Sequence, residues 1–342
     1  MLRRDAGQSP SDAAPGRDSV YGVVVIGRNE GERLRVCLDS MVTTTSRIVY
    51  VDSGSSDGSM EMAASKGVET IALDMSAPFT AARARNIGFD QLRRRWPDIA
   101  FVQFVDGDCE VIDGWLPTAC AYLQANPRVA CVCGRLRERF PERSVYNRLC
   151  DAEWARPAGE TAACGGIAMM RADLFESVGG FRADIAAGEE AELCSRLRAR
   201  GGMVWRLATP MALHDAAMYR FGQWWIRTRR TGFGYMNALA LLPGNDRPAD
   251  LRRVLRPWLW CVVLPLITGI GVAFWGRPAL LVLLVYPAQV MRNALAANGT
   301  WPARLERGFF LMLGKLPELV GQLQFWKSRR SNAASASFDY KA

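Results

Sequence analysis

Two kinds of segment alternate along the first part of the chain. Short apolar runs predict buried strands, and stretches in which apolar residues recur every three or four positions predict amphipathic helices. Strands are expected over residues 21–26, 47–51, 68–73, 99–105 and 128–134. Helices are expected over residues 31–42, 57–67, 80–95 and 115–126. Strands spaced by helices favour an α/β fold with a mostly parallel sheet flanked by helices.

The pattern is less regular between residues 136 and 247. Residues 163–181 mix a short strand, a helix and glycine turns. Residues 188–201 predict a helix, because acids stand in its first turns, arginines in its last turn and a glycine at its end. A strand over 203–208 and an amphipathic helix over 220–242, rich in Trp and Arg, are expected to follow.

The C-terminal part contains a nearly uncharged apolar stretch. Residues 258–275 would span about 27 Å as a helix, near the thickness of a bilayer core. A turn and a shorter apolar arm follow, so a membrane-associated helical hairpin is predicted over 258–291; a buried core helix pair is the alternative. Residues 308–326 include Lys315 and Glu318 among apolar positions, which indicates an interfacial helix.

Four regions are therefore expected. They are a disordered tail over 1–19, a catalytic α/β domain over 20–247, the membrane-associated helical region over 248–330 and a polar tail over 331–342. The first 19 residues contain no apolar core of a signal peptide.

The net charge is +9, and the positions of the basic residues bear on where the protein is located. Basic residues flank the apolar hairpin, which favours the cytoplasmic face of the cell (inner) membrane, with the catalytic domain in the cytoplasm. No nucleic-acid-binding module is recognisable, and the run "RLRERFPER" at 135–143 is interpreted as solvated surface. The nine cysteines form no C-x-x-C pair, so they are expected to be small buried hydrophobes in a reducing compartment.

Two carboxylates, Asp106 and Asp108, follow the apolar run at 99–105. Burying carboxylates without partners is costly, so a partner is expected. A simple Asp-Gly turn is one explanation. A calcium loop of the EF-hand type is excluded, because Val111 stands where the loop requires glycine. The third explanation is a site at the ligand-binding edge of the sheet, where the acids hold Mg²⁺ or Mn²⁺ beside a diphosphate.

The segment "DSGSSDG" at 52–58 is expected at the same edge and lacks the dinucleotide-binding spacing. Asp57 is predicted to cap the next helix, whereas Asp52 could accept hydrogen bonds from a base or ribose. His214, the only histidine, is either structural or a third metal ligand.

The acids of "GEEAEL" have two explanations as well. They compensate the dipole of the helix that they begin, or one of them points into the site as a general base.

Together these segments resemble the family-two glycosyltransferases, inverting nucleotide-sugar enzymes with the GT-A fold. The resemblance covers residues 20–245. Its elements stand in order: "VVVIGRNEGERLRVCLDS", "IVYVDSGSSDGS", "ARNIGFD", "FVDGDCEV", "GGIAMMRADLFESVGGF" and "GEEAELCSRLRARG". The resemblance implies a GT-A-like catalytic domain, a nucleoside-diphosphate sugar as donor and a divalent metal, Mg²⁺ or Mn²⁺.

The resemblance also implies roles for matching residues. Asp106 and Asp108 correspond to the D-x-D pair, with Asp108 as the direct metal ligand. Glu190 corresponds to the general base; because Glu stands where the family has Asp, Glu189 is an alternative base. The residues implied on the nucleotide side are Asp52, which contacts the base, together with Arg85, Asn29, Glu30 and Asp106.

The sequence departs from the family at Gly27, where proline is common, and at "QWWIRTRR", which lacks the Q-x-x-R-W spacing of processive members. A long-chain synthase is therefore not expected. Trp224 and Trp225 would lie at the membrane interface or pack against the catalytic domain. The predicted acceptor wall is "ACGGIAMM", whose glycines admit close approach of a ligand.

The predicted function is metal-dependent, inverting sugar transfer to a hydroxyl of a lipid-linked glycan acceptor in cell-envelope or exopolysaccharide synthesis. Membrane lipid and other proteins of a polysaccharide assembly pathway are the expected partners. The alternatives are a nucleotidyltransferase acting on sugar phosphates, a non-catalytic membrane scaffold, and a soluble enzyme with a buried apolar hairpin.

Overall fold

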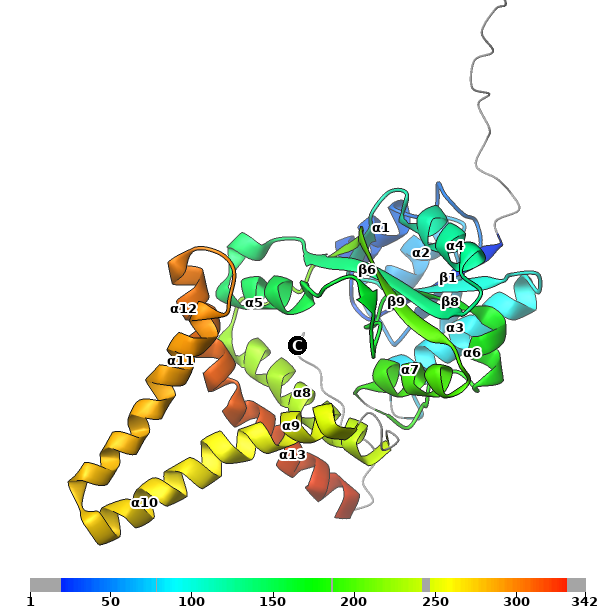
Figure 1. Ribbon diagram of the computed structural model, residues 1–342. Coiled ribbons are helices and arrows are strands. Elements are labelled where there is room, and N and C mark those ends of the chain that lie inside the picture. Colours follow the sequence, from blue (N-terminus) through cyan, green and yellow to red (C-terminus); the bar gives the residue numbers. More distant parts are fainter. Residues whose placement is uncertain (1–19, 78, 186, 242–246, 331–342) are drawn as a thin grey trace, which may run out of the picture.

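A single nine-stranded sheet with helices packed on it forms the N-terminal two thirds of the protein (Figure 1). The computed structural model describes residues 20–77, 79–185, 187–241 and 247–330, so both expected tails lie outside the described residues. The strands run in the order β3-β2-β1-β4-β8-β6-β9-β5, and β7 pairs with β9. Their bounds are β1 Tyr21–Gly27, β2 Ile48–Asp52, β3 Glu69–Ala72, β4 Phe101–Asp106, β5 Cys109–Val111, β6 Val129–Glu138, β7 Gly159–Glu160, β8 Ala168–Arg171 and β9 Met203–His214.

The first half of the sheet is parallel. Strand β1 pairs with β2 and β4, and β2 pairs with β3. The connecting helices are α1 Glu32–Asp39, α2 Ser59–Ser65 and α3 Ala81–Arg95. Because Gly27 is in register with Asp52, and Ile26 with Asp106, the carboxyl ends of β2 and β4 reach the same edge. The predicted α/β fold with a mostly parallel, helix-flanked sheet is confirmed.

The second half of the sheet is mixed. Strand β8 runs antiparallel between β4 and β6, and β9 runs parallel to β6. The short strand β5 turns back from the end of β4 and pairs antiparallel with β9, which places Cys109 opposite His214. The remaining helices of this half are α4 Trp115–Ala125, α5 Val145–Trp154, α6 Ala172–Ser177 and α7 Glu189–Ala199.

Strand β9 is longer than the sequence predicts. It continues past residue 208 through Pro210, where its pairing with β6 has a register shift that accommodates proline. The extension carries His214 to the end of β9, next to the segment that contains Asp108.

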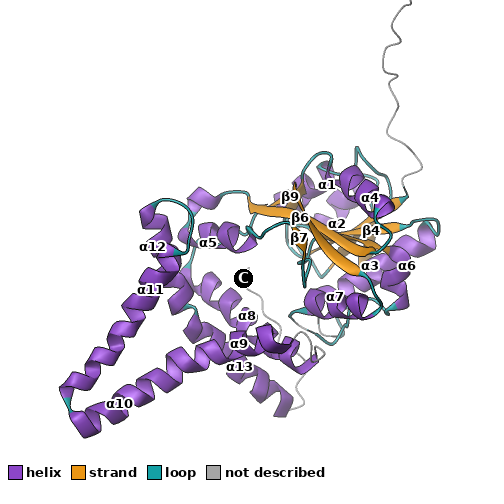
Figure 2. Cartoon of the chain, viewed as in Figure 1, coloured by secondary structure: helices purple, strands orange, loops and turns teal. Residues whose placement is uncertain are grey.

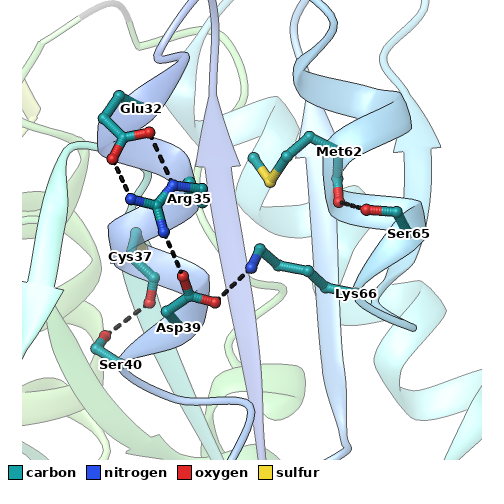
Figure 3. Close-up of polar contacts among 8 residues, drawn as sticks. All are labelled: Glu32, Arg35, Cys37, Asp39, Ser40, Met62, Ser65 and Lys66. Atoms are coloured by element: carbon teal, nitrogen blue, oxygen red, sulfur yellow. Dashed lines mark hydrogen bonds and ion pairs between the residues drawn. The ribbon is translucent and has the colours of Figure 1, made fainter.

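A network of charged side chains covers the outer surface of α1 and α2 (Figure 3). Arg35 bonds Glu32 (Nε to Oε2, 2.8 Å) and Asp39 (Nη1 to Oδ2, 3.0 Å). Lys66, just after α2, also bonds Asp39. Solvent-exposed pairs of this kind contribute little stability, about 0–1 kcal/mol each. These acids of the "GERLRVCLDS" segment are therefore surface residues outside the site described below.

Helices form most of the remaining described chain, residues 221–241 and 247–330 (Figure 2). Their bounds are α8 Phe221–Leu241, α9 Arg247–Trp258, a π-helical turn Leu259–Val263, α10 Leu264–Trp275, a 3-10 segment Arg277–Leu284, α11 Val285–Leu295, α12 Trp301–Leu313 and α13 Lys315–Arg330. Helices α8 and α13 cross in close contact. A Cβ atom at Gly232 would overlap the carbonyl oxygen of Glu318, and one at Gly321 would overlap that of Arg229.

The apolar hairpin projects away from the sheet, and α10 and α11 converge at an apex (Figure 1). Two helical runs, Leu251–Trp275 and Arg277–Leu295, are long and apolar enough to cross a membrane, with mean hydropathies of 1.9 and 1.3. Their large side chains are exposed, for example Phe274 at 79% and Leu281 at 67%. The alternative of a buried core helix pair is therefore wrong.

The segment 308–326, expected to be one interfacial helix, contains a break. Helix α12 ends before Gly314 and α13 begins at Lys315, because Pro317 lacks the amide hydrogen that would continue the bonding pattern. Helix α13 packs on α8, and Lys315 Nζ bonds both carboxylate oxygens of Glu318 at 2.8 and 2.6 Å.

Candidate active site

A cavity of about 790 Å³ lies between the sheet and helices α7, α8 and α9. Its wall combines the end of β4, the first turn of α7, the end of β9 and one face of α8. The lining includes Asp106, Glu189, Glu190, His214, Arg230 and Arg253. Five of the residues singled out in the sequence, these three acids and the histidine together with Arg85, therefore meet in one cavity, although up to 129 positions separate them along the chain.

Asp108 and His214 come together beside this cavity. His214 Nε2 lies 3.4 Å from Asp108 Oδ2, and Cys109 Sγ completes a group of three donor atoms within 4.8 Å of one another. The Asp108 side chain is only 2% exposed, and the His214 ring packs against Trp154 with ring centroids 4.8 Å apart. A carboxylate and an imidazole suit Mn²⁺, whereas the Cys109 thiol would favour a softer metal. The pair Asp108 and His214 thus fits a hard divalent cation.

Gly107, between the two acids, has no room for a side chain. A Cβ atom there would lie 3.2 Å from Ile26 O and 3.3 Å from Leu34 Cδ1, and the Gly107 amide donates to Ile26 O at 2.8 Å. The central residue of the D-x-D sequence therefore holds β4 against β1 and directs its two neighbours to different partners.

Asp106 is paired with Arg85 and not with Asp108 and His214. Arg85, on α3, donates from Nη2 to Asp106 Oδ1 at 2.8 Å and from Nη1 to Glu189 Oε1 at 2.9 Å. The guanidinium is buried and lies 5.4 Å from the centroid of the Phe181 ring. Arg85 joins the end of β4 to the first turn of α7 and also lines the cavity, and its predicted contact with the nucleotide stays a prediction.

Gly166 explains why this ion pair fits. A Cβ atom at Gly166 would come within 2.9 Å of Arg85 Nη2 and 3.0 Å of Asp106 Oδ2. Gly166 makes room for the Arg85–Asp106 pair and also lines the cavity, and the role of "ACGGIAMM" as an acceptor wall stays a prediction.

Glu189 and Glu190 have different surroundings. Glu189 is the first residue of α7 and is buried against Arg85. Glu190 is half-buried and lines the cavity, and burial together with the neighbouring charge of Glu189 raises the pKa of Glu190 to about 7. A carboxylate with such a pKa suits a general base near neutral pH. Glu192, the third acid of this segment, bonds Arg196 one turn later at 2.8 and 2.6 Å.

Asp52 is buried, and hydrogen bonds with its own loop occupy its oxygens. Oδ1 accepts from Tyr50 Oη at 2.8 Å, and Oδ2 accepts from the amides of Gly54 and Ser55 at 3.0 and 2.8 Å. Burial and the hydrogen bond to Asp52 raise the pKa of Tyr50. Asp57 accepts from the Ser59 amide at 3.1 Å at the start of α2, next to Gly58, which is the N-cap residue.

Asn29 and Glu30 shape the neighbouring loop. The Asn29 amide donates to Ser55 Oγ at 2.8 Å, and Asn29 Oδ1 accepts from the Ser56 amide at 2.8 Å. Glu30 pairs with Arg33 at 2.9 Å. None of Asp52, Asn29 and Glu30 lines the cavity that Glu190 and His214 share. Nucleotide contacts from these residues stay a prediction.

Glu138 is a buried acid that the sequence does not reveal. Its Oε2 accepts from the Ala216 amide at 3.2 Å, and its Oε1 accepts from Asn147 Nδ2 at 3.2 Å. Burial raises the pKa of Glu138 to about 7. This residue holds the chain after His214 against α5. The interpretation of its run, "RLRERFPER", as wholly solvated surface is wrong, and alternating basic residues around it hide the signal.

The aromatic start of α8 is packed inside the protein. Trp224 is 5% exposed and contacts Tyr146 and Phe310, with centroids 6.3 and 5.1 Å apart. Of the two alternatives for Trp224, packing against the catalytic domain is therefore the one observed. Gln223 Oε1 accepts from the amides of Tyr219 and Arg220 at 2.9 and 3.1 Å, which caps α8.

Eight of the nine cysteines are buried as free thiols, as predicted, and Cys261 is half-buried. Cys131, Cys164 and Cys194 pack together behind α7, with their Sγ atoms within 4.8 Å of one another.

Comparison with known proteins agrees with this geometry. Residues 22–179 match the family described as Glycosyl transferase family 2. The chain is 25% identical over 329 residues to the succinoglycan biosynthesis protein ExoA of Rhizobium meliloti (strain 1021), which covers 89% of this chain and 93% of the relative. The fold is similar to that of the mannosyltransferase PcManGT from Pyrobaculum calidifontis, solved with GDP-Man and Mn²⁺ (TM-score 0.60, 19% identity, 92% and 91% of the two chains covered). Residues 22–179 thus match a family 2 glycosyl transferase domain, the fold is of the GT-A type, and these similarities support a glycosyltransferase.

Proposed function

We propose that the protein is a metal-dependent, inverting glycosyltransferase that moves a sugar from a nucleoside-diphosphate sugar to a hydroxyl of a lipid-linked glycan acceptor. The observation that carries the proposal is Glu190, a carboxylate with a pKa of about 7 in the same cavity as Asp106 and His214. A base for the acceptor and the imidazole of the proposed cation site thus face one space, with Asp108 3.4 Å from His214 beside it. The pathway is exopolysaccharide or cell-envelope synthesis, which the similarity to a succinoglycan biosynthesis protein supports.

Asp108 and His214 would hold the cation, Mg²⁺ or Mn²⁺. Bound there, the cation neutralises charge on the donor diphosphate. PcManGT, which shares the fold, was solved with Mn²⁺ and GDP-Man. In this chain the loops of Asn29 and Asp52 stand at the same sheet edge as Asp106, which supports the nucleotide end of the donor there.

Glu190 accepts the proton of the acceptor hydroxyl. The freed oxygen attacks the anomeric carbon from the face opposite the diphosphate. A new carbon–oxygen bond forms as the bond to the diphosphate breaks, and the electron pair leaves with the nucleoside diphosphate. Configuration inverts because one displacement occurs, through a transition state with oxocarbenium character. Arg85 keeps Glu189 paired, so that Glu190 is the carboxylate that faces the acceptor.

The exposed apolar hairpin supports attachment to a membrane. Basic residues before and after it favour the cytoplasmic face of the inner membrane. A lipid-linked acceptor would be presented at that surface. Other proteins of the assembly pathway would then extend or export the product.

Release assays on the full-length protein test this function. Candidate nucleotide sugars are incubated with the detergent-purified protein, Mn²⁺ and a membrane lipid extract, and the released nucleotide is identified. We expect a nucleoside diphosphate, and at least a hundredfold loss of its release in folded Asp108→Ala and Glu190→Ala variants. Pyrophosphate release would instead indicate a nucleotidyltransferase. Equal turnover by wild type and both variants would refute the proposed site.

A further inference from the structure

The wall of the cavity carries both acidic and basic side chains. Besides Glu189, Glu190 and Asp106, its wall includes a group of arginines, and we call these the arginine wall: Arg156, Arg227, Arg230, Arg252 and Arg253. Glu153 also lines the cavity and pairs with Arg227 at 2.7 Å. Among the described lining residues the arginines outnumber the acids, and such a surface suits an anion.

One face of α8 forms part of this wall. The residues of α8 that line the cavity recur at helical spacing: Arg227, Arg230, Thr231, Gly234, Tyr235 and Ala238. The opposite face packs on α13 through Gly232, Phe233 and Met236. Helix α8 thus separates the cavity from α13 and presents its arginines from a packed element.

Helix α9 supplies the other part and is also held in place. The buried Gln322 on α13 donates from Nε2 to Val254 O at 3.2 Å and accepts from Trp258 Nε1 at 2.8 Å. Arg253 lies over Tyr235, with its guanidinium carbon 5.8 Å from the ring centroid. These contacts fix the helix on which Arg252 and Arg253 stand.

The wall continues into the apolar hairpin. Arg252 lines the cavity, and Leu255 and Leu259, three and seven positions later, share its face of the helix and are exposed. The same helical run, Leu251–Trp275, is one of the two apolar enough to cross a membrane. A positive group at the cavity therefore leads directly to an exposed apolar stripe.

We infer that the arginine wall binds the phosphate or diphosphate of a lipid-linked acceptor, whose hydrocarbon chain follows the stripe of Leu255 and Leu259. This inference rests on the proposed function and names the anionic group of its acceptor. Guanidinium groups bind phosphate with paired, charge-assisted hydrogen bonds. In the proposed function the donor diphosphate has its own partners, Asp108 and His214, through the cation. A neutral glycan acceptor would need no such concentration of positive charge.

Binding without donor tests the inference. The full-length protein in phosphatidylcholine nanodiscs is titrated with farnesyl diphosphate in EDTA, which silences the cation site. We expect binding that farnesol does not reproduce, and that Arg230→Gln and Arg253→Gln each weaken about tenfold. The matched control is Arg256→Gln, on the same helix but outside the cavity lining, and it should bind as wild type does.

Further binding experiments distinguish which phosphate-bearing molecule occupies the site. Inorganic pyrophosphate should compete only weakly, because it lacks the chain. Asp108→Asn should leave binding unchanged; if it abolishes binding, the probe occupies the donor site and the inference fails. Equal competition by phosphatidylglycerol vesicles would identify a membrane headgroup site instead, and equal binding of farnesol would exclude an anion site. Because no donor is present, these binding results do not depend on sugar transfer. The proposed function can therefore be refuted or supported independently of this inference.

Discussion

Arg85 Nη1 lies 2.9 Å from Glu189 Oε1, although 104 positions separate the two residues. Through its other terminal nitrogen the same guanidinium holds Asp106 at 2.8 Å. One buried cation therefore fixes the end of β4 relative to the first turn of α7, which carries Glu190. In the proposed function, this one side chain would position both the carboxylate next to the donor and the first turn that carries the base.

Removing that side chain should impair both stability and transfer. Arg85→Met leaves Glu189 buried without its partner, which costs about 3–5 kcal/mol of unfolding free energy. We expect sugar transfer to fall about a hundredfold or more, because Glu190 is no longer held in place. Thermal unfolding and nucleoside diphosphate release measure the two effects.

A double variant separates the effect of the unpaired Glu189 charge from the effect of losing the Arg85 side chain. Arg85→Met with Glu189→Gln should recover part of the lost stability, since the carboxylate without a partner is gone, while transfer stays low. If Arg85→Met alone unfolds and transfers as wild type does, the proposed positioning role is incorrect.

Transfer should depend on the ionisation of Glu190. Its pKa is raised from 4.5 to about 7, and only the ionised carboxylate can accept a proton. The turnover number should therefore rise with pH through about 7, and Glu190→Gln should lower it about 10²–10⁴-fold. A pH–rate profile of wild type, with the surface variant Glu61→Gln as control, measures this.

The pH dependence of thermal stability tests the raised pKa of Glu190 independently. A carboxyl with a raised pKa in the folded state favours folding while protonated, and this advantage is lost as pH rises from 4.5 through 7. Glu190→Gln should consequently raise the thermal unfolding midpoint at pH 8 and change it little at pH 4. A midpoint lowered at pH 8 would contradict the raised pKa.

Mn²⁺ affinity should depend on Asp108 and His214. Outer-shell substitutions typically cost about 10–100-fold in metal affinity, so losing a direct ligand should cost at least as much. Titrating Asp108→Asn and His214→Gln with Mn²⁺, followed by electron paramagnetic resonance, measures the loss. Cys109→Ser is the matched control, because its thiol suits softer metals. Wild-type affinity in Asp108→Asn would place the cation elsewhere.

The crossing of α8 and α13 should not tolerate a methyl group. Gly232→Ala and Gly321→Ala each force a Cβ atom into a backbone carbonyl of the other helix, so we expect both to lower the unfolding midpoint. Gly222→Ala, also on α8, meets nothing within 4 Å and should be neutral or stabilising by about 0.5–1 kcal/mol. Differential scanning fluorimetry compares the three; equal midpoints would contradict the close crossing.

The sequence predicted the parallel half of the sheet well, because each strand there is an apolar run next to an amphipathic helix. The family resemblance led us to expect Asp106, Glu190 and His214 in one site, and the three residues line one cavity. The sequence did not predict the partner of Arg85, which depends on how α3 and α7 pack far apart in sequence. Glu138 escaped notice for a related reason: burial of a single acid within a charged run depends on tertiary packing.

The anomeric configuration of the transferred sugar tests the central claim most directly. Wild-type protein, Mn²⁺, a donor from the release assay and a lipid-linked acceptor are combined, and the product is examined by NMR beside the released nucleotide. We predict a nucleoside diphosphate and a product of configuration opposite to the donor, both at least a hundredfold reduced with Glu190→Gln. Retained configuration, or undiminished product from folded Glu190→Gln, would contradict Glu190 as the base of an inverting transfer.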